Sequence, residues 1–195
     1  MVKKFQGILF LIIGNSGSGK DSIISGVIKK FPSHLKQIYA PKRFITRKPS
    51  ENEQNISVST REFRIMEEEE NFALSWHIYG LDYGIPIEIE KYLANDHPVI
   101  INVSRTIVAK AKEKYKNVKV IFIKVPFEIS YQRIKDRKRE TEDLVNERIE
   151  RARMNQNFPE ADFVLDNSGD LNDSIDACLN YLLKVINEKE KDIIN

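Results

Sequence analysis

The chain has 195 residues, enough for one domain with a sizeable core, and its 41% hydrophobic and 31% charged residues are typical of a globular protein. The net charge is only +2, with both signs interspersed, which argues against the concentrated basic face that binding to nucleic acid or a membrane surface needs. A single cysteine, Cys178, excludes an internal disulfide, and no signal peptide or membrane-length apolar run is present. We therefore expect a cytoplasmic protein with no nucleic-acid and no membrane partner.

The most informative stretch is a glycine-rich segment between an apolar run and a helical pattern. The run Ile8–Ile13 predicts a buried strand, and the pattern over Lys20–Lys30 predicts a helix. Strand, glycine loop and helix in this order indicate a phosphate-binding loop, in which backbone N–H groups point inward and Lys20 reaches the β- and γ-phosphates. The predicted ATP-binding residues are Gly14, Asn15, Ser16, Gly17, Ser18, Gly19, Lys20, Asp21 and Ser22.

The residue after the lysine departs from the usual loop pattern. A Ser or Thr normally follows the lysine and holds Mg²⁺, whereas this chain has Asp21. Conversely, Asn102 stands at the end of a predicted strand where such enzymes usually present an Asp toward the metal. We expect Asp21 to supply the acidic contact to Mg²⁺. The alternative, that Asp21 only stabilises the first helical turn and Ser22 serves the metal, stays open.

Strands and helices alternate along the rest of the chain. Strands are predicted at 99–103, 118–125 and 163–165. Helices are predicted at 87–93, after the strand at 99–103 through Lys114, at 127–137, at 141–155 and at the C-terminus. Ser59 to Glu62 has the spacing of a capping box, and 72–87 reads as short strands and turns. Cys178 lies on the apolar face of the closing helix and is expected in the core. The pattern predicts an α/β fold with a mostly parallel central sheet and ligands at the carboxyl ends of its strands.

Two basic segments near residue 140 suggest a phosphate-facing function. Arg133 and Arg137 share one helix face, and Arg148 and Arg151 lie on the following helix. Two basic helices joined by a short polar loop are typical of a lid that closes over a nucleotide, although a solvated basic face is the alternative. Phosphoryl transfer needs cations around the moving phosphate. The predicted catalytic residues are Lys20, Arg133, Arg137 and Arg148.

Two further stretches could bind an acceptor. Arg43 and Arg47 flank a short extended segment and could hold a phosphate bidentately. His77 and Tyr83 lie in a predicted glycine-bounded hairpin. His77 could bind a phosphate or a sugar hydroxyl, and the alternative is a structural histidine with a satisfied hydrogen bond.

These segments occur in the order seen in guanylate kinases, which the chain resembles over nearly its whole length: Gly14 to Lys20, Thr46-Arg47, Tyr83-Gly84 and the arginine-rich pair of helices. The resemblance implies a nucleoside-monophosphate-kinase-like three-layer fold, with one domain over 1–195, an acceptor-binding insertion at about 40–90 and a helical lid at about 133–152. It further implies the acceptor-binding residues Arg43, Thr46, Arg47, His77, Tyr83, Ser104 and Arg105.

Five segments resemble one branch of this family, the ribose 1,5-bisphosphate phosphokinases. They are Gly-Lys-Asp-Ser at 19–22, Arg-Phe-Ile-Thr-Arg at 43–47, Ala-Leu-Ser-Trp-His at 73–77, Gly-Leu-Asp-Tyr-Gly at 80–84 and Asn-Val-Ser-Arg at 102–105. The resemblance implies an ATP-dependent phosphotransferase of phosphonate breakdown that makes 5-phosphoribosyl 1-diphosphate. It also implies ATP and Mg²⁺ as cofactors and a phosphorylated sugar as partner, with a homodimer left open.

Departures from guanylate kinases support the same branch. Ser50 replaces the second arginine after Thr46-Arg47, and Asn55 aligns roughly with the tyrosine that contacts the acceptor phosphate. Ser75 and Trp76 stand where a guanine-reading glutamate is expected. The alternatives that stay open are a guanylate kinase, converting GMP to GDP, and a non-catalytic nucleotide-binding module.

Overall fold

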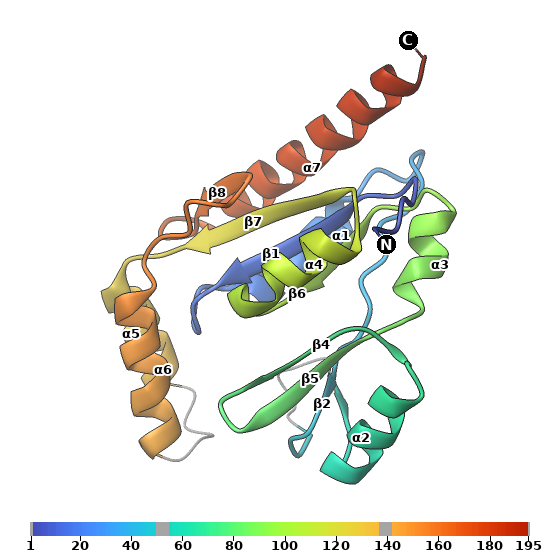
Figure 1. Cartoon of the computed structure of the whole chain (residues 1–195). Coiled ribbons are helices and arrows are strands. Elements are labelled where there is room, and N and C mark those ends of the chain that lie inside the picture. The colour runs from blue at the N-terminus through green and yellow to red at the C-terminus, as the bar shows by residue number, and fades with distance from the viewer. Residues whose placement is uncertain (1, 50–54, 137–141, 195) are drawn as a thin grey trace. The chain divides into compact units, whose positions relative to one another are not determined.

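The computed structural model describes residues 2–49, 55–136 and 142–194 (Figure 1). Its elements are β1 (Leu9–Gly14), α1 (Lys20–Lys30), β2 (Phe44–Ile45), β3 (Ile56–Ser57), α2 (Thr60–Glu68), β4 (Phe72–Ile78), β5 (Leu81–Pro86), α3 (Ile89–Ala94), β6 (Val99–Asn102), the 3₁₀ turn η1 (Arg105–Ile107), α4 (Val108–Lys114), β7 (Val118–Lys124), α5 (Phe127–Lys135), α6 (Glu142–Met154), β8 (Phe163–Asp166) and α7 (Leu171–Ile194). This alternation is that of the predicted α/β class.

The chain divides into two compact units, which are described separately. The first contains the residues up to Leu11 together with His34–Val118, and the second contains Ile12–Ser33 together with the residues from Lys119 onward. One sheet has the strand order β6-β1-β7-β8, and the boundary between the units falls inside β1. The residues from Leu9 to Ile13 are fully buried, as expected for a strand covered on both faces.

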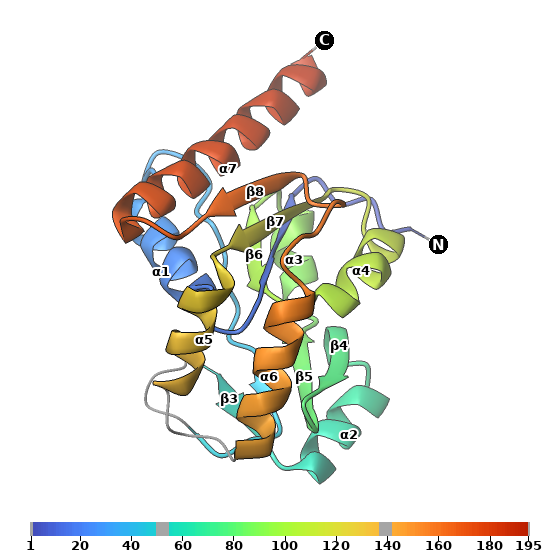
Figure 2. The same ribbon diagram turned by 90° about the vertical axis from the view of Figure 1, so that its left-hand side faces the viewer.

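In the second unit, helices pack beside the parallel pair β7 and β8. Ile121 lies opposite Phe163, and Lys124 lies opposite Asp166. Helices α1 and α7 lie side by side (Figure 2). Cys178 of α7 is fully buried, and burial raises the pKa of its thiol to about 12, so the thiol stays protonated at neutral pH. The prediction that Cys178 is a core residue is confirmed.

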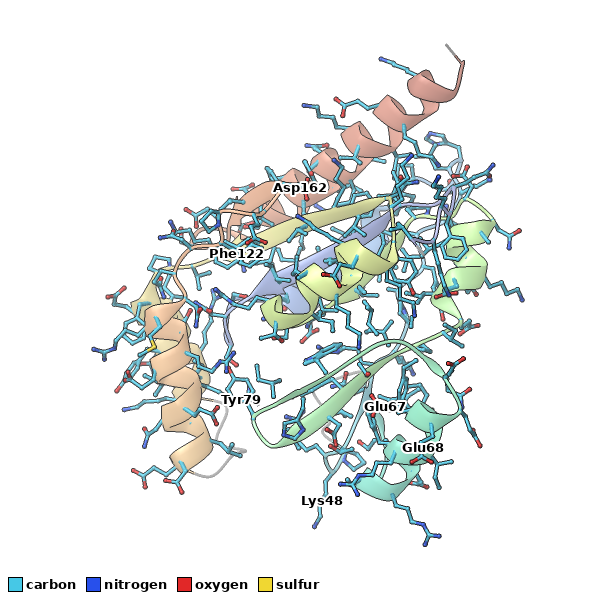
Figure 3. All side chains as sticks on the ribbon, viewed as in Figure 1. Lys48, Glu67, Glu68, Tyr79, Phe122 and Asp162 are labelled. Carbon is cyan, nitrogen blue, oxygen red and sulfur yellow. The ribbon has the colours of Figure 1, made fainter. Side chains whose placement is uncertain are left out.

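The first unit carries a second sheet, of order β3-β2-β5-β4. Strands β4 and β5 form an antiparallel hairpin whose turn contains Tyr79 (Figure 3). Strand β2 pairs antiparallel with β5 and parallel with β3. Helix α2 lies beside the hairpin and begins with the predicted capping box: the Ser59 hydroxyl accepts from the Glu62 amide, and the Glu62 carboxylate accepts from the Ser59 amide at 2.7 Å.

A partly buried ionic network joins distant segments of the first unit. The Glu90 carboxylate accepts hydrogen bonds from Lys3 Nζ at 2.5 Å and from the Tyr115 hydroxyl at 2.7 Å, and Lys114 Nζ lies 3.6 Å away. Burial alone would raise the pKa of Glu90, but the contacts with Lys3, Tyr115 and Lys114 hold it below its ordinary value. Lys114 also donates to the Ala73 carbonyl, so the network ties α3 and α4 to β4.

We expect the Glu90→Gln variant to lose about 1–3 kcal/mol of stability at neutral pH, because a charge-assisted pair of hydrogen bonds is lost. Since the pKa of Glu90 is lower in the folded than in the unfolded state, its contribution is present above the unfolded pKa and disappears as the pH falls through the folded pKa. Urea unfolding at about pH 7 and about pH 3 should therefore show a gap between wild type and variant that closes in acid.

The exposed Glu113 of α4 provides the matched control, and Glu113→Gln should change stability by less than about 0.5 kcal/mol at either pH. A gap for Glu90→Gln that stays constant with pH would show that its charge does not act through this network.

Candidate functional site

The loop after β1 has the geometry of an anion-binding turn. Gly19 is the N-cap of α1 and has a left-handed conformation with φ of 89°. Because glycine has no side chain, the N–H groups of the first turn of α1 are not capped locally and can donate to a ligand. A Cβ atom at Gly14, whose φ is 156°, would lie 2.6 Å from the Ile123 carbonyl oxygen. Both positions therefore require glycine.

Lys20 lies over the loop that precedes it. Its Nζ atom donates to the carbonyl oxygens of Gly14 and Asn15, each at 2.8 Å, and lies 3.5 Å from the Ser18 hydroxyl. The lysine charge is therefore held against the glycine-rich loop. Its contact with the terminal phosphates of a nucleotide stays a prediction.

Two residues from outside the loop support its other carbonyl groups. Arg133 of α5 donates through Nη1 to the Gly17 oxygen at 3.1 Å, and Asn167 donates through Nδ2 to the Ser18 oxygen at 2.8 Å. Asn167 is only 3% exposed, and a Cβ atom at Gly19 would lie 2.4 Å from its Nδ2 atom. Asn167 was not predicted from the sequence, although its position just after β8, at the carboxyl end of a parallel strand, is a signal for it.

Helix α6 also contacts the loop. Arg148 is 8% exposed, and its Nη1 atom donates to the Ser16 hydroxyl at 2.7 Å. The Asn15 amide donates to two carbonyls at the C-terminal end of the helix, those of Ala152 and Asn155. Three of the predicted catalytic residues, Lys20, Arg133 and Arg148, are thus brought to one loop. The fourth, Arg137, lies outside the described residues, and the lid stays a prediction.

The predicted metal residue lies at the same end of α1. Asp21 and Ser22 both belong to the first helical turn and are exposed. A carboxylate at this place is favoured by the positive end of the helix dipole, so the geometry fits both alternatives for Asp21. Its contact to a metal stays a prediction.

In the first unit, Arg43 and Tyr83 form one cluster of predicted acceptor-binding residues. The Arg43 guanidinium carbon lies 5.8 Å from the centre of the Tyr83 ring, and the Trp76 ring stacks parallel to Tyr83 with centroids 5.3 Å apart. Arg43 also donates to the Asn102 carbonyl at 3.1 Å and to the Asn55 side chain at 3.3 Å. Pairing of β2 with β5 and of β5 with β4 brings these side chains together.

A second cluster is built on the neighbouring cross-strand pair of the same hairpin, because His77 lies opposite Asp82 next to the pair of Trp76 and Tyr83. The His77 ring Nδ1 is 2.6 Å from an Asp82 carboxylate oxygen, and the Asp82 amide donates to the Thr46 hydroxyl at 2.8 Å. Holding Nδ1 against a carboxylate leaves Nε2 on the far side of an exposed ring. Both readings of His77 are compatible with this geometry, because the bond to Asp82 orients the ring whether or not it binds a ligand.

The remaining predicted acceptor residues are Arg47, Ser104 and Arg105, which follow β2 and β6. Arg47 follows β2 and is half-buried. The Ser104 hydroxyl accepts from the Thr106 amide at 3.3 Å and caps η1, which begins with the half-buried Arg105. Ser104 therefore has a local structural role, and its contact to an acceptor stays a prediction.

The site and fold agree with comparisons of the whole chain. The guanylate kinase family model matches residues 6–188, and the chain belongs to this family. A curated relative from Pseudomonas paraeruginosa, "Ribose 1,5-bisphosphate phosphokinase PhnN", is 34% identical over 178 residues, which are 90% of this chain and 95% of the relative. Proteins of the same name from Bradyrhizobium diazoefficiens and Pectobacterium parmentieri are 33% and 37% identical, over 92% and 84% of this chain and 88% and 87% of their own length.

A solved guanylate kinase structure, from Anaplasma phagocytophilum, superposes with a TM-score of 0.64 at 16% identity. The match covers 94% of this chain and 88% of that structure, so the predicted kinase-like fold is confirmed. Within the described residues, no helix combines the length and the apolar character needed to cross a bilayer.

We expect Asn167→Ala to weaken ATP binding by about 5- to 50-fold, because the Ser18 carbonyl loses its buried donor and the loop loses its support at Gly19. Isothermal titration with a non-hydrolysable ATP analogue measures this directly. Asn172→Ala, at an exposed asparagine of α7, is the matched control and should leave the affinity within twofold. Equal affinities for Asn167→Ala and wild type would rule out a supporting role for Asn167.

Proposed function

We propose that this chain transfers the γ-phosphate of ATP to ribose 1,5-bisphosphate, giving 5-phosphoribosyl 1-diphosphate and ADP. The observation that carries the proposal is the gathering of Lys20, Arg133 and Arg148 at one glycine-rich loop. The curated relatives that bear the name of this activity, at 31–37% identity, support the choice of acceptor. The alternative acceptor is GMP, because the chain belongs to the guanylate kinase family.

The donor half of the reaction follows from the loop. Its backbone amides and the N-terminus of α1 bind the phosphates of ATP, and Lys20 moves from the loop carbonyls to the β- and γ-phosphate oxygens. A 1-phosphate oxygen of the acceptor attacks the γ-phosphorus, and the bond from that phosphorus to the ADP oxygen breaks. Arg133 and Arg148 neutralise charge on the equatorial oxygens. The attacking oxygen is already deprotonated at neutral pH, so no side chain needs to act as a base.

The residues at the start of α1 suit a magnesium ion. Magnesium prefers oxygen ligands and is usually held by one or two carboxylates together with the phosphates of the substrate. Asp21 and Ser22 are exposed oxygen donors in the helical turn that follows Lys20, which fits this arrangement. An ion held by Asp21 or Ser22 would supply positive charge that neutralises part of the charge on the ATP phosphates.

The acceptor half draws on side chains of the first unit. Arg47 and Arg105 are the cations we assign to the two phosphates of the sugar, and Arg43 holds Tyr83 in place through its contacts with Asn102 and Asn55. Thr46 and His77, joined through Asp82, supply a hydroxyl and a ring nitrogen for a small polar ligand. The rings of Trp76 and Tyr83 stack on each other, and this pair is the neighbour of the His77–Asp82 pair in the hairpin.

The proposal predicts turnover of ribose 1,5-bisphosphate with ATP and no efficient formation of GDP from GMP. Product formation from each acceptor, followed by phosphorus NMR, decides between the two. Lys20→Ala serves as the control and should lose nearly all activity with the productive acceptor, because the lysine charge at the β- and γ-phosphates is removed. Formation of GDP without the sugar diphosphate would overturn the proposal and favour a guanylate kinase.

Asp21→Asn should raise the Mg²⁺ concentration needed for half-maximal rate by about 10-fold or more, since an amide replaces a charged ligand. Ser22→Ala is the matched variant in the same turn and should shift the titration less. The reverse order of effects would assign the metal to Ser22 and leave Asp21 as a residue that stabilises only the helix.

A further inference from the structure

The side chain of Asn15 contacts a helix far away in the sequence. Its Nδ2 atom donates to the Ala152 carbonyl at 3.2 Å and to the Asn155 carbonyl at 3.0 Å, across about 140 residues. The last four carbonyl groups of an α-helix accept no hydrogen bond from the backbone of the same helix, so they need donors from elsewhere. Asn15 therefore caps the C-terminal end of α6 from within the phosphate-binding loop.

The next loop residue contacts the preceding turn of the same helix. The Ser16 hydroxyl accepts from Arg148 Nη1, and Arg148 and Ala152 are four residues apart. Residues at this spacing lie one above the other on the same helix face, and both are buried here. Two successive loop residues thus hold two successive turns of α6. Such a pair of contacts determines both the rotation of the helix about its axis and its position along that axis.

We propose that Asn15 is a positioning residue that holds the Arg148 guanidinium against the phosphate-binding loop. The sequence pattern includes Asn15 among the ATP-binding residues, but a phosphate ligand would use its backbone N–H, whereas its side chain is engaged by α6. This inference rests on one part of the proposed function, the transfer of a phosphate from ATP. It does not depend on which acceptor receives the phosphate.

The consequence for the rate follows from the place of Arg148. An arginine at the loop stabilises the charge that develops on the phosphate during transfer. Displacing its guanidinium group therefore raises the free energy of the transition state more than it weakens nucleotide binding. A displacement of about 1 Å can cost about 100-fold in rate. Loss of the Asn15 cap should therefore lower kcat while leaving the KM for ATP nearly unchanged.

The test compares Asn15→Ala, the isosteric Asn15→Asp, Arg148→Ala and the double variant Asn15→Ala with Arg148→Ala. A carboxylate cannot donate to the α6 carbonyls, so both Asn15 variants should lose about 10- to 100-fold in kcat. In Asn15→Ala, which adds no charge to the loop, the KM for ATP should change by less than about threefold. The kcat of the double variant should lie within about twofold of the kcat of Arg148→Ala, because the two residues act through one contact.

Asn155→Ala is the matched control at the same end of α6. The Asn155 side chain donates to the Arg151 carbonyl of its own helix, and the variant retains the backbone carbonyl that accepts from Asn15. Its kcat should stay within twofold of wild type. Additive losses in the double variant, full activity of Asn15→Asp, or an equal rise in the KM of Asn15→Ala for ATP would each overturn the proposal.

Hydrogen exchange of the α6 amides supplies a readout that does not depend on the acceptor. Exchange over residues 148–154 should be about tenfold faster in both Asn15 variants than in wild type or Asn155→Ala. Unchanged exchange would overturn the positioning role whatever the kinetics. A wild-type protein that fails to use ribose 1,5-bisphosphate would contradict the proposed function instead, and the exchange comparison would still decide this inference.

Discussion

A loop that turns its N–H groups inward to bind phosphate must turn carbonyl groups elsewhere, and those carbonyls need donors of their own. In this chain Lys20 serves two of them, at Gly14 and Asn15. Arg133 serves Gly17, and Asn167 serves Ser18. The donors come from α1, from α5 and from the segment after β8, so satisfying one short loop requires elements spread over the whole second unit. The conformation of the loop therefore depends on these elements being packed in place.

The donors also differ in whether they can keep their hydrogen bonds to the loop when a nucleotide binds. Asn167 is neutral, buried and held in place, and it can keep its bond to Ser18 with or without a nucleotide. Lys20 and Arg133 are cations bonded to neutral carbonyls, and a phosphate is a stronger partner for either. The same contacts that stabilise the loop therefore hold two cations close to the place where we propose that they act.

The local part of this arrangement was predictable from the sequence, and the non-local part was not. Strand β1, the loop and α1 were predicted because apolar runs, glycines and helical periodicity are signals between near neighbours. Asn167 and the contact of Asn15 with α6 join residues about 140–150 positions apart, which no periodicity reports. The extended segment between Arg43 and Arg47 was predicted and contains β2, but its pairing was not, and β3 was missed because it has two residues and exists only through pairing with β2.

The acceptor clusters show the same division. Arg43, Thr46, His77 and Tyr83 were selected by residue type and by resemblance, and the sheet register then decides which of them meet. Tyr83 pairs across the strands with both Ile45 and Trp76, which places Arg43 and Trp76 within reach of its ring. His77 pairs with Asp82, and Asp82 in turn bonds to Thr46. Register cannot be read from single residues, so two separate clusters were not foreseen.

The two halves of the chemistry differ in how they depend on sequence. Phosphate binding by the loop uses backbone groups, and it restricts side chains mainly where a Cβ atom would collide, as at Gly14 and Gly19. Such a site can persist while most other positions change, which is compatible with a shared fold at 16% identity to a guanylate kinase structure. The acceptor binding that we propose for the first unit would instead depend on side chains such as Arg43, Thr46 and His77. If acceptor binding is as we propose, a change of acceptor needs new side chains on the sheet β3-β2-β5-β4, whereas the nucleotide loop and its donors can stay as they are.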